Sequence, residues 1–249
     1  MEQAPRIDPH FSVLVAGHRP HRLPADSDAL QAIESAIDRL VAHIAVRFAR
    51  LVDCPEIYGA DATPRCVTRI IAGGYEGTDE MATHIATARG IPLHRVMTAV
   101  EAQHALAPVD GPDRRDLVLG EPHDAGASSA TIRLRDETAL AFSDLVIVVW
   151  DGRDPNGPVG GTVRLLREAV LCNKPVVWID LHGAVRLLDI SRVDEPTLYL
   201  LGVEDAIAEL LRPLFATLTE EALDVELALV ANPLAPLAGP RHRAHGRRD

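Results

Sequence analysis

One segment of the chain, residues 143–180, constrains the fold more than any other. It reads SDLVIVVWDGRDPNGPVGGTVRLLREAVLCNKPVVWID. The apolar runs at 145–150 and 175–179 are typical of strands buried on both faces. Between them, a loop of Asp, Asn, Pro and Gly leads into a helical pattern that opens at residues 160–162. Strand, glycine loop, helix and strand form the βαβ unit of a parallel sheet, and such a loop is a common place for phosphates to bind.

The same alternation of strands and helices fills the chain before this segment. Glycine-containing turns follow the first two apolar runs, and Gly90 is positioned to stop a helix. The pattern weakens over residues 101–129, which we expect to be a long, partly helical connection. Expected strands cover residues 11–16, 66–72 and 92–100; expected helices run from the capping residues at 24–28 to about residue 51, then over 80–88 and 131–142.

The region after residue 180 is less regular. We expect a loop at 190–196, a short strand at 197–201, a helix at 203–218 that Pro213 kinks or splits, and a helix at 220–230. The predicted fold class is α/β: a Rossmann-like, doubly wound, mostly parallel sheet with helices on both faces, plus a C-terminal helical extension. Residues 1–183 would form the ligand-binding domain, 184–232 an extension that packs on the core or serves oligomerisation, and 233–249 a flexible basic tail or linker.

Composition narrows the function classes. The formal net charge of −11 disfavours non-specific nucleic-acid binding, and only the basic stretch at 241–248 offers a local exception. No apolar run approaches the roughly 18 to 20 residues of a membrane span, and the first residues do not resemble a secretory signal. The three cysteines lack CxxC spacing, and the histidines show no metal-binding motif. We therefore expect a cytoplasmic protein with reduced, partly buried thiols, no membrane contact and no metal or required cofactor.

Three glycine loops mark a candidate ligand site. They contain Gly17, Gly73-Gly74 and Gly160-Gly161, and in a parallel sheet they would share one edge, where a reversal of strand order opens a crevice. Free N–H groups at the helix start near Thr162 suit a phosphate or carboxylate. The side chains expected beside the ligand are Arg19 and Arg164 as phosphate partners, Glu76, Asp79 and Asp151 as acceptors from ribose or base, and His18 and Thr78 in the same loops.

Each feature also has a purely structural interpretation. The glycines can serve turns alone, Asp79 and Thr162 can cap helices, and His18, Arg19 and Arg164 can be solvated. A third interpretation is catalytic: Glu76 and Asp79 are candidate catalytic residues that would form an acid/base set across the crevice with His18. Three such loops on one edge favour ligand binding.

The motifs GHRP, AGGYEGTD and SDLVIVVWDG…GGT…NKPVVWID resemble the SLOG superfamily, which groups the Smf/DprA and LOG proteins. The resemblance covers roughly residues 10–183. It implies a Rossmann-like domain that binds nucleotides or their derivatives at the glycine loops. Some members of the superfamily are phosphoribohydrolases; others are thought to sense NAD-derived or other nucleotide signals in bacterial defence, often fused to effector domains.

The chain departs from the LOG enzymes in one respect. Those enzymes carry PGGxGTxxE, with an acidic residue just inside the helix. When the Gly-Thr pairs are aligned, Arg164 and Leu165 stand at that place, and the nearest acid is Glu168, about 4.5 to 6 Å further along the helix axis. The departure argues against LOG-type catalysis and leaves nucleotide binding in place.

The preferred hypothesis is therefore a sensor of a nucleotide or NAD-derived ligand such as ADP-ribose. It would form a homo-oligomer, a dimer or larger, and would act with an effector domain or partner protein. The alternatives are a LOG-like phosphoribohydrolase or N-glycosidase that releases a base, and a non-catalytic assembly subunit.

Overall fold

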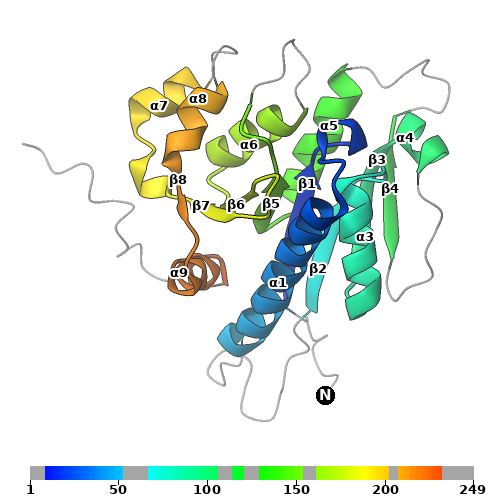
Figure 1. Cartoon of the computed structure of the whole chain (residues 1–249), viewed down its shortest axis with the longest axis horizontal. Helices are drawn as coiled ribbons and strands as arrows, with labels where there is room; N and C mark the ends of the chain where they lie inside the picture. The colour runs from blue at the N-terminus through cyan, green and yellow to red at the C-terminus, as the bar shows by residue number, and fades with distance from the viewer. Residues whose placement is uncertain are drawn as a thin grey trace, which may run out of the picture.

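The computed structural model describes residues 9–52, 67–105, 114–120, 129–153, 161–201 and 207–231. Within them, eight strands form one sheet in the order β4-β3-β2-β1-β5-β6-β7-β8 (Figure 1). The pairs from β4 to β6 are parallel, and β7 and β8 join antiparallel. The strands are β1 His10–Gly17, β2 Val67–Ala72, β3 Leu93–Thr98, β4 Arg115–Leu119, β5 Leu145–Val149, β6 Val176–Ile179, β7 Val185–Leu188 and β8 Phe215–Thr217. The predicted α/β class and mostly parallel sheet are confirmed.

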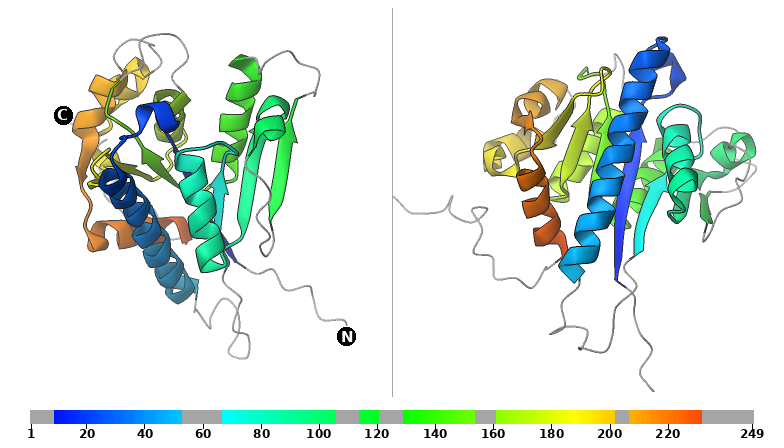
Figure 2. Two further views of the ribbon diagram at one scale, coloured as in Figure 1. Left: turned by 45° about the vertical axis from the view of Figure 1, so that its right-hand side comes forward. Right: turned by 60° about the horizontal axis from the view of Figure 1, so that its bottom comes forward.

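Helices cover both faces of the sheet, as the views in Figure 2 show. One core joins the sheet to α1, α3 and α9, and the other joins it to α5, α6 and α8. The α-helices are α1 Ser27–Val52, α3 Thr78–Arg89, α4 Ala99–His104, α5 Ser129–Ala141, α6 Gly161–Leu171, α7 Glu195–Leu200, α8 Ile207–Leu211 and α9 Glu220–Ala231; short 3-10 turns are η1 Pro20–Arg22, η2 Ile190–Arg192 and η3 Arg212–Leu214.

The central strands are buried on both faces because each serves both cores. In β5, Ile147 and Val149 face the first core, while Val146 and Val148 face the second. This alternation follows from the two-residue period of a strand. It explains why the sequence here is apolar without interruption.

Strand order reverses beside β1. The chain passes from β1 through α1 to β2 on one side, then returns through α5 to place β5 on the other side of β1. The carboxyl ends of β1 and β5 are therefore neighbours, and the helices that follow them, α1 and α6, pack in the two different cores on opposite faces of the sheet. This is the position at which doubly wound sheets bind ligands.

The structure corrects several expected elements in the first part of the chain. The third strand ends at Thr98 and not at residue 100, because Thr98 and Glu101 form a capping box that starts α4. The expected connection at 101–129 includes β4, an exposed edge strand. The expected stop at Gly90 is confirmed, since this glycine ends α3 with φ +63°.

Larger corrections lie in the C-terminal region, which contains strands as well as helices. The expected strand at 197–201 is wrong, because residues up to Leu200 belong to α7. The expected helix at 203–218 is α8 followed by η3 and then β8, and β7 was not expected. The expected helix at 220–230 is confirmed as α9.

None of the described helices has the length and apolar character needed to cross a membrane. Cys172 is exposed and not partly buried as expected, while Cys54 and Cys66 lie outside the described residues. The basic stretch at 241–248 and residue Gly160 also lie outside them.

Candidate functional site

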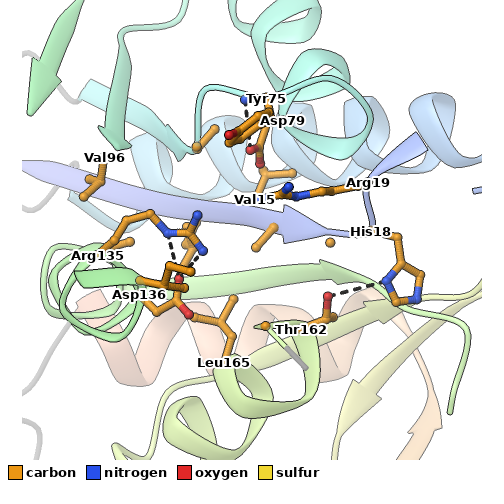
Figure 3. A pocket seen from close by; sticks show the side chains of 18 of the residues that line it. Val15, His18, Arg19, Tyr75, Asp79, Val96, Arg135, Asp136, Thr162 and Leu165 are labelled. Atoms are coloured by element: carbon orange, nitrogen blue, oxygen red, sulfur yellow. Dashed lines mark hydrogen bonds and ion pairs between the residues drawn. The ribbon is translucent and has the colours of Figure 1, made fainter. Parts of the chain in front are cut away.

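A cavity of about 540 Å³ opens at the carboxyl ends of β1 and β2. Figure 3 shows its lining, which comes from β1, the loop before α3, helix α5 and the start of α6. The predicted site residues that line it are Gly17, His18, Arg19, Gly73, Glu76, Asp79, Gly161 and Thr162. The structure thus gathers residues from all three glycine loops around one cavity.

The side of the cavity formed by β1 and α3 is tightly packed. A Cβ added at Gly17 would lie 2.7 Å from both the Val149 carbonyl oxygen and Thr78 Oγ1. The Thr78 hydroxyl donates to the His18 carbonyl over 3.1 Å and is buried. Gly17 is therefore required by the close approach of β1, β5 and α3.

His18 is almost completely buried and joins three elements. Its Nε2 atom lies 3.1 Å from both the backbone nitrogen and Oδ1 of Asp151, and its Nδ1 atom lies 3.5 Å from Thr162 Oγ1. Burial, followed by the nearby Arg22 guanidinium, lowers the pKa of His18, although Asp151 opposes this. His18 is therefore neutral at pH 7 and holds the strand ends together.

Asp79 is the most perturbed acid of the cavity. Burial raises the pKa of Asp79 to about 6, against the opposing effects of Arg135 and of backbone N–H groups at Tyr75 and Gly73. The Tyr75 N–H lies 3.4 Å from Asp79 Oδ2, and a Cβ on Gly73 would collide with the same carboxylate. Asp79 lies inside α3, whose N-cap is Gly77, so its carboxylate contacts the glycine loop and does not cap the helix from the N-cap position.

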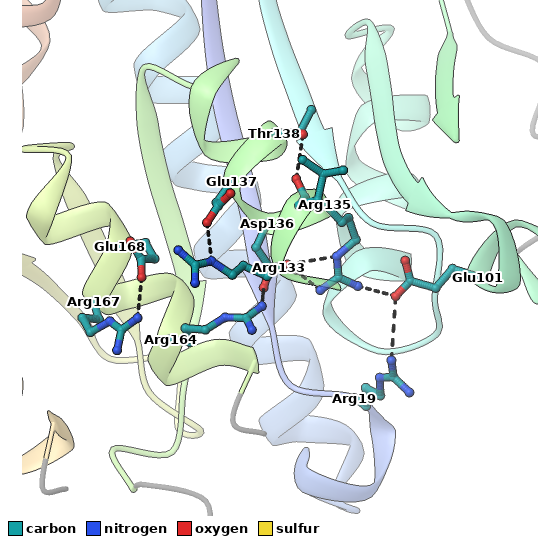
Figure 4. A network of polar contacts seen from close by, with 11 residues as sticks. Arg19, Glu101, Arg133, Arg135, Asp136, Glu137, Thr138, Arg164, Arg167 and Glu168 are labelled. Carbon is teal, nitrogen blue, oxygen red and sulfur yellow. Dashed lines mark hydrogen bonds and ion pairs between the residues drawn. The ribbon is translucent and has the colours of Figure 1, made fainter. Parts of the chain in front are cut away.

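A network of charges on α5 forms the floor of the cavity, and Figure 4 shows its members. Arg135 makes ion pairs with Glu101, whose side chain is only 3% exposed, and with Asp136 at 2.5 Å. Asp136 also accepts from Arg164 at 2.7 Å. These contacts fix Arg135 and Asp136 at the cavity, since the charges neutralise one another away from water.

The mouth of the cavity is formed by more exposed side chains. The guanidinium of Arg19 lies 4.3 Å from the ring centroid of Tyr75, and its side chain is 54% exposed. Its distance to Glu101 is 3.9 Å, which is a loose contact. Arg19 can therefore turn toward an anion at little cost, and the exposed Glu76 lies nearby.

The start of α6 forms the opposite side and is open. A Cβ added at Gly161 would meet no atom of the described residues within 4 Å. Helix α6 begins at Gly161, so Thr162 lies in its first turn and does not precede it as a cap. The first N–H groups of a helix have no partner within the helix, and here they lie beside the cavity.

Four predicted site residues do not line this cavity. Arg164 contacts Asp136, Thr78 is buried against His18, and Gly74 packs against Met97. Asp151 accepts from Arg22 at 2.7 Å and from the Arg153 N–H at 3.1 Å, and it faces a second cavity. Arg164 and Asp151 thus form ion pairs within the protein, and their predicted contacts with phosphate and ribose stay predictions.

Sequence reasoning missed five polar lining residues: His21, Arg22, Tyr75, Arg135 and Asp136. Tyr75 stands within the quoted glycine loop, so its position alone would have included it. For Arg135 and Asp136 the signal was topological. Helix α5 leads into β5, which lies next to β1 where the strand order reverses, so this helix passes the crevice. Charged residues within α5 were thus candidates.

The described residues contain no group of three or more His, Cys, Asp or Glu side chains that could hold a metal ion. The fold and the crevice define a Rossmann-like α/β protein with a candidate small-molecule site. The chain matches no protein-family model and no curated protein.

Proposed function

We propose that the protein binds a nucleotide or an NAD-derived nucleotide, such as ADP-ribose, in this crevice and acts as a sensor of that ligand. The observation that carries the proposal is the open start of α6 at Gly161, which lies on a cavity at the switch point of the sheet. A volume of about 540 Å³ falls in the range of small-molecule sites. The resemblance to the SLOG superfamily supports the same ligand class.

The lining suggests how such a ligand would lie. Its phosphate groups would meet the N–H groups of α6 and the exposed guanidinium of Arg19. Its hydroxyl groups or base amines would donate to the carboxylates of Asp79 and Asp136 on the opposite side. The positive groups of the lining thus suit the phosphates of a nucleotide, and the carboxylates suit the hydrogen-bond donors of its ribose and base.

The test is calorimetric titration with ADP-ribose, cyclic ADP-ribose isomers, NAD and nucleoside monophosphates. Gly161→Phe places a large side chain at the helix start, where no atom of the described residues opposes it within 4 Å of the Cβ, and should abolish binding with little loss of stability. Ser35→Phe, at an exposed position of α1, is the matched control and should bind as the wild type does. Absence of binding by every compound contradicts the proposal.

Oligomeric state is part of the same test. A sensor that acts through assembly or a partner should keep its size in light scattering when Gly161→Phe removes binding. If the variant loses assembly while no compound binds the wild type, the chain is better described as an assembly subunit.

One observation favours a second candidate, base-releasing hydrolysis: a carboxyl group with a pKa of about 6 lies in the cavity. Such a group is partly protonated near neutral pH and can exchange a proton with a leaving base. Chromatography of AMP and NAD after incubation would reveal free base, and Asp79→Asn should abolish its release. Intact substrates at high protein concentration would exclude this candidate.

A further inference from the structure

A second cavity, of about 580 Å³, lies beside the crevice beyond the carboxyl ends of β5 and β6. Its basic lining residues come from four separate segments: Arg22 from η1, Arg153 after β5, Arg186 from β7 and Arg212 from η3. Four arginines thus line this cavity in a chain whose formal net charge is −11. The overall composition does not account for this local excess of positive charge.

Two of the four arginines are neutralised by neighbouring carboxylates. Arg22 contacts Asp151 at 2.7 Å, and Arg186 contacts Asp180 at 3.3 Å. Asp180 also accepts hydrogen bonds from the backbone N–H groups of His182 and Ala184, at 2.9 and 3.0 Å. Its carboxylate therefore also stabilises the turn that follows β6.

Arg153 and Arg212 have no ion pair with a carboxylate of the described residues. Among the described residues, no acid therefore balances the positive charges of these two side chains. Guanidinium groups present several N–H donors in a fixed plane, which match the oxygens of a phosphate.

The floor of this cavity is rigid. Trp178 donates from Nε1 to the Trp150 carbonyl at 2.8 Å, and Trp150 donates to the Arg153 carbonyl at 3.0 Å. Arg186 stacks over Trp178 at 4.6 Å from the ring centroid. Gly152 has φ +75°, and a Cβ there would lie 3.4 Å from the Trp178 ring. The backbone before Arg153 is thus held against the indole rings, which fixes the position from which the Arg153 side chain extends.

We propose that this second cavity is an anion site that binds a phosphate or diphosphate group through Arg153 and Arg212. This proposal holds whether or not a nucleotide binds in the crevice. Arg22 lines both cavities, so the anion can be either a free inorganic phosphate or the distal phosphate of a molecule held in the crevice.

The experiment uses the full chain and inorganic pyrophosphate as the probe, titrated by calorimetry at constant ionic strength. The double variant Arg153→Gln/Arg212→Gln should weaken pyrophosphate binding at least tenfold. Both side chains are exposed, so the variant should keep the thermal midpoint of the wild type. Arg39→Gln removes an exposed charge on α1 and should bind as the wild type does.

Gly161→Phe separates this proposal from the proposed function. Pyrophosphate binding that survives in Gly161→Phe but not in the double variant supports the second site, whether or not ADP-ribose binds. No binding by the wild type, equal binding by the double variant, or loss in Gly161→Phe alone overturns it. Once the site is supported, displacement of pyrophosphate by ADP-ribose identifies the anion as a distal phosphate, and lack of displacement identifies a free anion.

Discussion

The two sides of the crevice use glycine for different reasons. On the side of β1 and α3, Gly17 has no room for a side chain because the Val149 carbonyl and Thr78 fill the space. On the side of α6, a Cβ added at Gly161 would meet no atom of the described residues within 4 Å. The first glycine allows the backbone to pack, whereas the second leaves the cavity and the helix N–H groups accessible. A glycine loop in the sequence therefore has two possible meanings, and only the surrounding atoms distinguish them.

The largest expected difference between the two sides is in stability. Gly17→Val should lower the free energy of unfolding by about 3 kcal/mol, because the new side chain must displace backbone. Gly161→Val should change it by less than about 1 kcal/mol. Urea denaturation of both variants checks this, and equal losses would contradict the contrast between the sides.

A smaller effect is expected at Asp79, and it depends on pH. An acid with a folded-state pKa raised from 3.8 to about 6 binds its proton more tightly in the folded protein, so its contribution to stability falls as pH rises from about 4 to 6. Asp79→Asn removes this loss and should stabilise the protein by about 1 to 2 kcal/mol above pH 6.5. It should have little effect near pH 4. Urea denaturation at pH 4 and pH 7.5 measures the difference in unfolding free energy between the variant and the wild type. If this difference is the same at both pH values, burial does not raise the pKa of Asp79.

The smallest effect is expected where the two sides meet. Thr162 Oγ1 and His18 Nδ1 lie 3.5 Å apart, which is at the limit of a hydrogen bond. Thr162→Val keeps the shape and should cost less than about 0.5 kcal/mol in the same denaturation assay. A loss above 1.5 kcal/mol would mean that the two sides are held together by this contact.

Periodicity predicted the elements that are buried and regular. The β5–α6–β6 unit was expected because its strands are continuously apolar and a glycine loop separates them from an amphipathic helix. The crevice followed from the rule that parallel strands end at the same edge. These features follow from patterns among residues that are close together in the chain, so they can be recognised in a single amino-acid sequence.

The missed elements depend on contacts between distant residues. β4 is exposed along most of its length, so it shows no apolar alternation. Residues 197–201 favour a strand by composition, yet Asp194 caps α7 through the Thr197 N–H, and Pro196 suits its first turn. To predict that Arg135 and Asp136 point toward the cavity, one must know which carboxylates and guanidinium groups form ion pairs between α4, α5 and α6.

The central place of β1 has a consequence for how the chain folds. β1 lies near the N-terminus, yet one of its two neighbours is β5, and the Ser12 N–H donates to Asp144 across 132 positions. Helix α1 is likewise joined to α9 through Arg47 and Asp224. During synthesis, one edge of β1 must wait unpaired until most of the sheet has emerged. Because so many native contacts join distant parts of the chain, we expect refolding to be slow compared with that of a helical protein of equal length.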